Sequence, residues 1–324
     1  MKIALLINRE GFEKYTNWNS FGWDLIHLGN QALDIAEIVA TNAGVIVADA
    51  ITKVGSDIIG NMPQLKLVHS QGVAYNAIDI DAAKSAGVYV CNCAGANARS
   101  VAEHAVMLML VLLKNFRYNG EMVYEGRQME AKTASFLNGP QELFGLKVGI
   151  VGYGAIGRML AAMLKPFGCE LYFHDAFVTE SAGSDAAYMQ LEEVYSKCDI
   201  ISLHVPVTPA TENMINRETL KRFKKGAILI NTARGELMDH AAVAEALISG
   251  RLGGLGADTL APEPFDMNSP LINGLPKDIR RNVALSPHIA GITPGFFVRA
   301  FERIRRNIEA VANGKRPECV VNGL

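Results

Sequence analysis

The stretch that decides the fold is LKVGIVGYGAIGRMLAAMLKPFG, from Leu146 to Gly168. An apolar strand leads into a glycine-rich turn, and a helical pattern follows. Because Gly152 and Gly154 lack side chains, the backbone can turn sharply and approach a pyrophosphate at the N-terminus of the helix opening near Ala155. Gly157 lets that helix lie close to the strand. The stretch therefore predicts the phosphate-binding turn of a dinucleotide fold.

Asp175 ends the next apolar stretch, ELYFHD, about where a ribose-binding acid belongs in such a fold. A G-x-G-x-x-G run alone has a simpler interpretation, a turn that needs positive φ. The strand, the helix and the acid together favour a cofactor site. S-adenosylmethionine and flavin sites use similar glycines, so other parts of the sequence must identify the cofactor.

Composition limits the classes of function. The 324 residues suffice for two domains, and 31 basic against 33 acidic residues, a formal charge of −2, do not indicate a nucleic-acid partner. The opening MKIALLINRE does not resemble a signal peptide, and the longest apolar run, Ala105 to Leu113, is too short to cross a membrane. Five cysteines, an odd number, favour reduced thiols, so we expect a cytoplasmic protein. Cys91 and Cys93 have C-x-C spacing but no accompanying pair, so we interpret them as packing residues and expect no metal site.

Short β-rich runs alternate with helical patterns along the chain. These runs are apolar on both faces, which favours parallel strands covered by helices on each side. So many strands in one sheet would be unusual, so we expect two α/β domains. Besides the strand before the glycine turn, the runs are Lys2 to Ile7, Gly44 to Asp49, Leu65 to Ser70, Val88 to Asn92, Glu170 to Asp175, Asp199 to Val205, Ala227 to Thr232, Gly254 to Asp258 and Val283 to Ser286.

Two long helical patterns are candidates for the crossings between domains. The first runs from about Arg99 to Gly120, and the capping-box spacing of Ser100 and Glu103 suits a helix start there. The second, Thr293 to Asn313, has proline in its opening turn and glycine just past its end. We therefore predict two Rossmann-like, doubly wound parallel-sheet domains. A cofactor domain, residues 99–292, is inserted into a substrate-binding domain made of residues 1–98 and 293–324.

Three polar side chains follow apolar strands in the second half, where open parallel sheets have their ligand crevice. Arg234 follows AILINT, Glu263 lies in a loop framed by prolines, and His288 follows VALSP. Together they suit reduction of a 2-oxo acid: Arg234 binds the carboxylate, His288 supplies the proton, and Glu263 orients the imidazole. Taken one at a time, each residue has a structural interpretation. Arg234 could form a surface ion pair, Glu263 could cap a loop, and His288 could be a core histidine bonded to the backbone. Their joint placement at strand ends favours the catalytic interpretation.

The sequence closely resembles the D-isomer-specific 2-hydroxyacid dehydrogenase family over nearly its whole length. The resemblance is carried by GYGAIG with Asp175, LHVPVTPATENMIN, NTARGELMD, DTLAPEP, SPHIAGIT and GANARSVAEHAVMLML. It implies that Arg234, Glu263 and His288 are catalytic, and that the protein binds NAD and forms a homodimer through the cofactor domain. The cofactor contacts expected from the glycine turn and the resemblance are Gly152, Gly154, Ala155, Ile156, Gly157, Asp175, Val205, Pro206, Thr211, Thr232, Ala233, Arg234, Asp258 and His288.

One segment departs from the family pattern. Where the family has a run of the type GVGxDNID, this sequence reads GVAYNAIDID, with Ala74 in place of a glycine. The backbone N–H groups of Gly72, Val73 and Ala74 still suit a substrate carboxylate, alongside Arg234 and His288. Gln71 stands where relatives with phosphorylated substrates often have a basic residue. The aromatic stretch from Phe12 to Trp23 either walls the substrate pocket or packs against a helix.

The sequence thus predicts an NAD-dependent oxidoreductase that interconverts a small 2-oxo acid and its D-2-hydroxy acid. Within the same family, the alternatives are enzymes acting on phosphoglycerate, on hydroxypyruvate or glyoxylate, on formate or on phosphite. An alternative of another class is an NADH-sensing interaction protein, because relatives include transcriptional corepressors. We expect a small-molecule substrate and neither a nucleic-acid nor a membrane partner.

Overall fold

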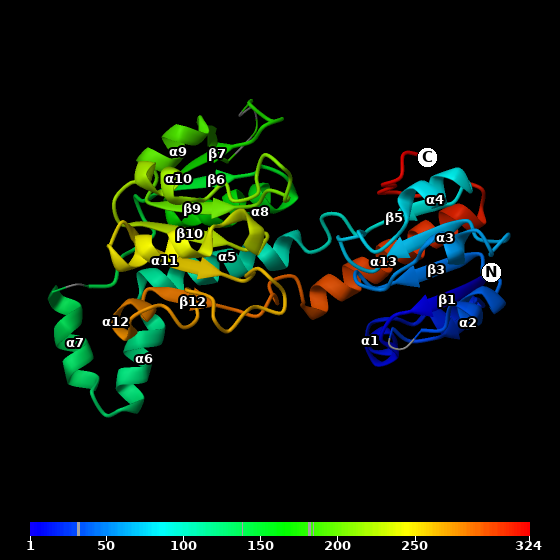
Figure 1. The fold of residues 1–324 in the computed structure, drawn as a ribbon, viewed down its shortest axis with the longest axis horizontal. Coiled ribbons are helices and arrows are strands. Elements are labelled where there is room, and N and C mark those ends of the chain that lie inside the picture. The colour runs from blue at the N-terminus through cyan, green and yellow to red at the C-terminus, as the bar shows by residue number, and fades with distance from the viewer. Residues whose placement is uncertain (31–32, 138, 181–182, 184) are drawn as a thin grey trace. The chain divides into compact units, whose positions relative to one another are not determined.

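The computed structural model describes residues 1–30, 33–137, 139–180, 183 and 185–324, which form two compact units (Figure 1). The terminal unit comprises Met1–Asn97 and Ile292–Leu324, and the central unit comprises Ala98–Gly291. Each unit has its own sheet, and every strand pair in both sheets is parallel. This confirms the predicted fold class, α/β with two parallel-sheet domains.

The terminal unit has a five-stranded sheet in the order β2-β1-β3-β4-β5. Its strands are β1 (Lys2–Leu6), β2 (Asp24–His27), β3 (Val45–Ala48), β4 (Leu67–Ser70) and β5 (Tyr89–Cys91). Its helices are α1 (Arg9–Tyr15), the 3₁₀ turn η1 (Trp18–Phe21), α2 (Ile35–Ala40), α3 (Ser56–Ile59), α4 (Ile80–Ser85) and α13 (Pro294–Ala312).

The central unit has a seven-stranded sheet in the order β12-β11-β10-β9-β6-β7-β8. Its strands are β6 (Lys147–Val151), β7 (Glu170–His174), β8 (Ala187–Tyr188), β9 (Ile200–Leu203), β10 (Ala227–Asn231), β11 (Leu252–Ala257) and β12 (Val283–Leu285). Its helices are α5 (Ala98–Leu113), α6 (Phe116–Tyr124), α7 (Gln128–Leu137), α8 (Ala155–Leu164), α9 (Leu191–Lys197), α10 (Arg217–Arg222), α11 (His240–Ile248) and α12 (Lys277–Arg280), with 3₁₀ turns η2 (Lys165–Phe167) and η3 (Gly235–Leu237).

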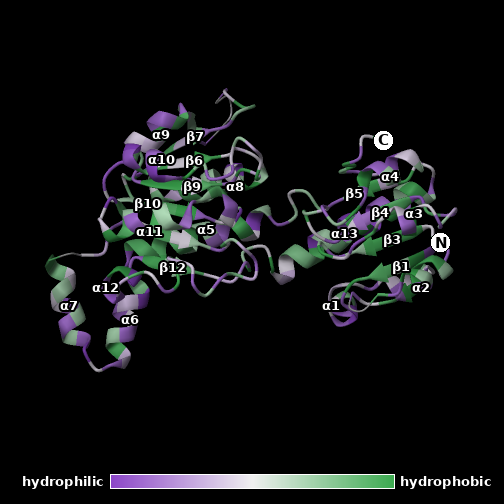
Figure 2. Ribbon diagram, viewed as in Figure 1, coloured by the Kyte–Doolittle hydropathy of each residue, from purple (hydrophilic) through white to green (hydrophobic). Residues whose placement is uncertain are grey.

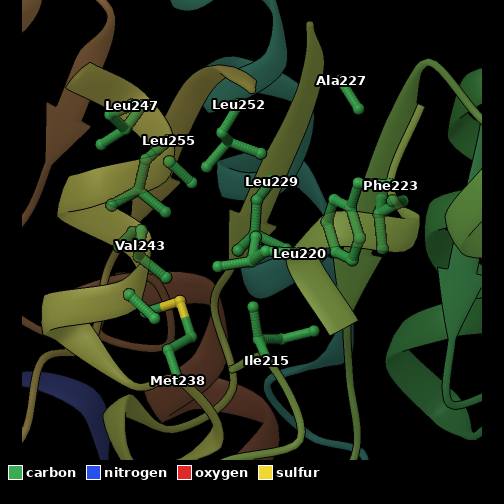
Figure 3. Close-up of a cluster of buried hydrophobic side chains, with 14 of the residues drawn as sticks. Ile215, Leu220, Phe223, Ala227, Leu229, Met238, Val243, Leu247, Leu252 and Leu255 are labelled. Atoms are coloured by element: carbon green, nitrogen blue, oxygen red, sulfur yellow. The ribbon is translucent and has the colours of Figure 1, made fainter. Parts of the chain in front are cut away.

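Each sheet is buried on both faces because successive side chains of a strand point to opposite sides. In β1, Ile3 and Leu5 pack on the face covered by α13, and Ala4 and Leu6 pack on the opposite face. Strands β1 and β3 are accordingly hydrophobic in Figure 2. In the central unit, leucines such as Leu229 meet side chains of α10 and α11 (Figure 3). Helices α5 and α8 lie together on the other face.

The predicted helix from Arg99 to Gly120 is wrong in its extent. Helix α5 ends at Leu113, and Asn115, in the left-handed region at φ +49°, precedes α6. Asparagine tolerates this region better than most residues, so the chain changes direction there. The predicted start, about Arg99, agrees with Ala98 to one residue, but the capping box at Ser100 is wrong, because the turns over residues 94–97 lead directly into α5 and place Ser100 inside the first turn. Helix α13, capped by Thr293, matches its prediction closely.

The aromatic stretch packs against α13 within the terminal unit. Phe12 and Trp18 are buried, and their rings lie 5.6 and 5.9 Å from that of Phe301. Tyr15 stacks on Phe297 at 5.1 Å. Helix packing, one of the two interpretations of this stretch, accounts for these contacts.

The surroundings of Cys91 and Cys93 show how these two side chains are used. Cys91 and Cys93 are fully buried in the core beneath α13, where burial raises the pKa of each thiol to about 12. Both therefore behave as apolar packing residues. Within the described ranges, no cluster of three or more His, Cys, Asp or Glu side chains suits a metal ion, and no helix is long and apolar enough to cross a membrane.

Candidate active site

The predicted cofactor residues of the central unit lie at the carboxyl ends of neighbouring strands. Gly152 follows β6, Asp175 follows β7, Thr232 follows β10, Asp258 follows β11, and His288 closely follows β12. Because all strands are parallel, these carboxyl ends lie side by side at the same end of the sheet. The fold therefore gathers side chains that are far apart in the sequence along a single edge.

The glycine turn leaves room for a ligand at the N-terminus of α8. A Cβ on Gly152, at φ +96°, would lie 2.5 Å from the carbonyl oxygen of His204, and one on Gly157 would lie 2.2 Å from the carbonyl oxygen of Gly152. Both positions therefore require glycine for packing. A Cβ on Gly154, by contrast, would meet no heavy atom of the described residues within 4 Å. Open space beside the first amides of α8, which include those of Ala155 and Ile156, fits a pyrophosphate.

Asp175 is held in one orientation by backbone amides. Its Oδ2 accepts a hydrogen bond from Tyr153 N at 2.7 Å, and its Oδ1 accepts from Phe177 N and Val178 N at 2.8 and 3.1 Å. Partial burial opposes ionisation, but these three amides hold the pKa of Asp175 below its ordinary value. The carboxylate is thus ionised and fixed beside the glycine turn.

The loops after β9 and β10 hold the other predicted cofactor residues. The Thr211 hydroxyl donates to Pro206 O at 2.6 Å and accepts from Thr208 N at 2.8 Å, so it closes the loop that begins at Val205. Oγ1 of Thr232 is buried and has no hydrogen-bond partner within the described part of the chain. A buried hydroxyl without a partner suits a polar group of a bound ligand.

Glu263 and His288 form a direct pair. Nδ1 of His288 lies 2.7 Å from Oε1 and 2.9 Å from Oε2 of Glu263. Both side chains are about half exposed, at 43% for His288 and 52% for Glu263. Because a carboxylate only accepts hydrogen bonds, Nδ1 carries the proton, and Nε2 is left for a ligand.

Arg234 lies in a turn that is fixed by a buried asparagine. Asn231 Nδ2 donates to Arg234 O at 2.7 Å, and Asn231 Oδ1 accepts from Ala233 N at 3.0 Å. The exposed guanidinium makes one hydrogen bond to the described residues, from Nη1 to Ala233 O, so its other donors are available for an anion. A Cβ on Gly235 would lie 2.3 Å from Ala261 N, so this turn packs closely against the start of the Glu263 loop.

Asp258 is buried and bonds to the His288 loop. Its Oδ1 accepts from Ser286 Oγ and Ile289 N, and its Oδ2 accepts from Ala290 N. The sequence predicted Asp258 as a cofactor contact only, and it did not single out Asn231 or Ser286. Both residues could have been found from the sequence, because each is a polar residue at or just past the end of an apolar strand, Asn231 in NTARG and Ser286 in LSPH.

The predicted substrate-binding segment lies in the terminal unit, just after β4. Ser70 Oγ accepts from Gly72 N at 3.2 Å and donates to Ala74 O at 2.6 Å, which fixes a tight loop. Within the described residues, the N–H groups of Val73 and Ala74 have no acceptor. The geometry of this loop therefore suits an anion.

Comparison with known proteins identifies the family. Residues 106–290 match the model of the D-isomer specific 2-hydroxyacid dehydrogenase NAD binding domain. This chain belongs to that family. Its central unit is accordingly an NAD-binding domain, and the open space at Gly154, the fixed Asp175 and the unpartnered Thr232 hydroxyl fit this cofactor.

Individual family members give the extent of the similarity. The chain is 37% identical to D-3-phosphoglycerate dehydrogenase of Haemophilus influenzae over 75% of its length and 57% of that protein. It is 34% identical to glyoxylate reductase of Thermofilum pendens over 83% of its length and 78% of that protein. The structure of D-2-hydroxyisocaproate dehydrogenase matches all of this chain and is fully covered by it, with a TM-score of 0.87 and 27% identity.

Proposed function

We propose that the protein is an NAD-dependent dehydrogenase that reduces a small 2-oxo acid to a D-2-hydroxy acid and catalyses the reverse reaction. The observation that carries this proposal is the pairing of His288 Nδ1 with Glu263 at 2.7 Å beside a strand-edge cofactor site. The D configuration and the class of substrate rest on the family to which the chain belongs.

When bound at the strand ends of the central unit, NADH would supply the hydride for the proposed reduction. His288 donates the proton from Nε2 to the carbonyl oxygen, and its ring ends neutral. Glu263 holds the ring by Nδ1 and stabilises the imidazolium before transfer. Oxidation of the hydroxy acid reverses the step, with neutral Nε2 accepting the hydroxyl proton.

Arg234 is proposed as the carboxylate clamp. Its guanidinium offers two parallel N–H donors, which match a carboxylate and also polarise the adjacent 2-oxo group. Lysine cannot reproduce this contact, because it carries a compact charge without the fork. Arg234→Lys should therefore lower kcat/KM by about ten-fold or more. An unchanged kcat/KM would remove Arg234 from this role.

The terminal unit is proposed as the substrate-binding domain. The unpartnered amides of Val73 and Ala74 support it, because they can bind a carboxylate without any side chain. The absence of a basic side chain at Gln71 favours an unphosphorylated acid over phosphoglycerate. Hydroxypyruvate, glyoxylate, formate and phosphite remain alternatives within the family.

We also propose a homodimer formed through the central unit. Helices α6 and α7 lie together and extend away from the sheet, with hydrophobic segments on both (Figures 1 and 2). Apolar surface of this extent on a helical pair is typical of a protein interface. Its most exposed large side chains are Phe116 (70%), Tyr124 (95%), Met129 (66%), Phe136 (81%) and Leu137 (82%). Sedimentation of the wild type and of Tyr124→Arg/Leu137→Arg tests this: a dimer that the double variant converts to monomer is expected.

A cytoplasmic location is proposed as well. All five cysteines lie in the described part of the chain and are free thiols, which suits a reducing compartment.

The deciding experiment follows NADH loss at 340 nm with a panel of pyruvate, glyoxylate, hydroxypyruvate and longer 2-oxo acids. The proposal expects turnover of at least one acid, and loss of that turnover in His288→Ala. NADH binding without any turnover would instead favour the NADH-sensing interaction protein.

A further inference from the structure

Three hydrogen-bonded side chains connect helix α5 to the loop that carries His288. Nε2 of His104, on α5, lies 2.7 Å from Ser286 Oγ, and Ser286 Oγ lies 2.6 Å from Asp258 Oδ1. Asp258 is 1% exposed, and the His104 side chain is 13% exposed. The proposed chemistry uses neither His104 nor Ser286.

The direction of these hydrogen bonds follows from the donors available. A carboxylate only accepts, so the single hydroxyl proton of Ser286 is donated to Asp258. Ser286 Oγ is then the acceptor for His104, whose Nε2 must carry a proton. The Nε2 atom of His104 also lies 3.6 Å from Oδ1 of the buried Asp258 carboxylate.

Asp258 in turn holds the backbone on both sides of the His288 side chain. Its carbonyl oxygen accepts from His288 N at 2.7 Å. Its carboxylate accepts from Ile289 N at 3.0 Å and from Ala290 N at 2.8 Å. His288 itself has φ +56°, a left-handed conformation that is uncommon for a non-glycine residue and that these hydrogen bonds help to hold.

We infer that Ser286 and His104 are positioning residues for His288, acting through Asp258; this rests on the proposed role of His288 as proton donor. The Ser286 hydroxyl fixes the Asp258 carboxylate in the orientation that receives both amides. Without it, Oδ1 keeps only the Ile289 amide as a donor, the carboxylate is held less firmly, and the left-handed turn loses part of its support. Nε2 of His288 then spends less time in line with the substrate, which lowers the rate of proton transfer.

The variants separate this role from general packing. Ser286→Ala removes the hydroxyl, and Ser286→Thr retains it. His104→Phe removes the donor, and His104→Gln retains one in case the aromatic substitution does not fold. Ser196→Ala is the matched control, because Ser196 is an exposed residue of α9 whose hydroxyl makes only local hydrogen bonds, to Glu192 O and Glu193 O.

Two measurements on the 324-residue chain decide the inference. The first is hydrogen–deuterium exchange of the backbone amides of segment 286–292, measured without cofactor. These amides should exchange about ten-fold faster than wild type in Ser286→Ala and His104→Phe. In Ser286→Thr and Ser196→Ala they should exchange at the wild-type rate. The second is steady-state reduction of the best 2-oxo acid of the panel. There, kcat should fall by about ten-fold or more in Ser286→Ala, while KM for NADH changes by less than about two-fold, and threonine should restore kcat.

Unchanged exchange in Ser286→Ala, or faster exchange with unchanged kcat, would overturn the inference. If the wild type reduces no 2-oxo acid, the proposed function fails separately. The exchange measurement then still decides whether Ser286 and His104 hold the His288 loop.

Discussion

Nδ1 of His288 lies 2.7 Å from Oε1 of Glu263, although 25 residues separate them in the sequence. The pair forms because the loop after β11 returns across the end of the neighbouring strand β12. The contact fixes which ring nitrogen is protonated, and it leaves Nε2 for the substrate.

This pairing predicts a particular pH dependence. Reduction needs a protonated His288, so kcat/KM for the oxo acid should fall at high pH, and kcat/KM for the hydroxy acid should fall at low pH. Glu263→Gln keeps the shape of the contact but removes the negative charge beside the ring, so kcat/KM for the oxo acid should fall by about ten-fold or more. His288→Ala should lose most turnover and bind NADH almost as tightly as wild type. An unchanged kcat/KM in Glu263→Gln would show that Glu263 does not act on the histidine.

The glycine turn offers a matched pair of substitutions. Gly154→Ala places a methyl group in open space, so the protein should keep its melting temperature but bind NADH at least about ten-fold more weakly. Gly157→Ala forces a methyl group against the Gly152 carbonyl oxygen, so it should lower stability by roughly 1–3 kcal/mol. Thermal unfolding and NADH titration of both variants provide the comparison. Normal NADH affinity in Gly154→Ala would place the pyrophosphate elsewhere.

Asp175 should make the enzyme prefer NADH over NADPH. The three amides that hold its carboxylate prevent it from turning away from a 2′-phosphate, so repulsion persists, whereas ribose hydroxyls can donate to it. We expect kcat/KM to be at least about ten-fold higher with NADH, and Asp175→Ala to narrow the ratio. Glu193→Ala, at an exposed acid paired with Lys197 on α9, is the control and should leave the ratio unchanged. Equal values for both cofactors in the wild type would refute this role.

A partly buried histidine, His204, should make stability depend on pH. Burial lowers the pKa of His204 to about 4, below its ordinary value near 6.5. The unfolded chain therefore binds more protons between these values, and stability falls as pH decreases from about 6.5 to about 4. Between pH 7 and pH 5 the contribution of His204 is on the order of 2 kcal/mol. Urea unfolding followed by circular dichroism should show a smaller loss over this range in His204→Asn than in wild type. An identical loss of unfolding free energy in both proteins would show that His204 does not cause the pH dependence.

The sequence by itself determined the local elements and the class of fold. The glycine turn, the doubly apolar strands and the helix from Thr293 depend on local turn chemistry and on hydrophobic period, which are visible in short windows. The polar residues after the strands also followed from the sequence, because parallel strands present their carboxyl ends at one edge.

Only the tertiary structure decided how these parts meet. The edge strands β2 and β8 carry too little apolar signal in two to four residues, and the break at Asn115 depends on a single left-handed residue. The bonds of Asp258 to Ser286, Ile289 and Ala290 depend on β11 and β12 being neighbours in the sheet. Strand order and side-chain direction arise from packing over the whole unit, which no local pattern specifies.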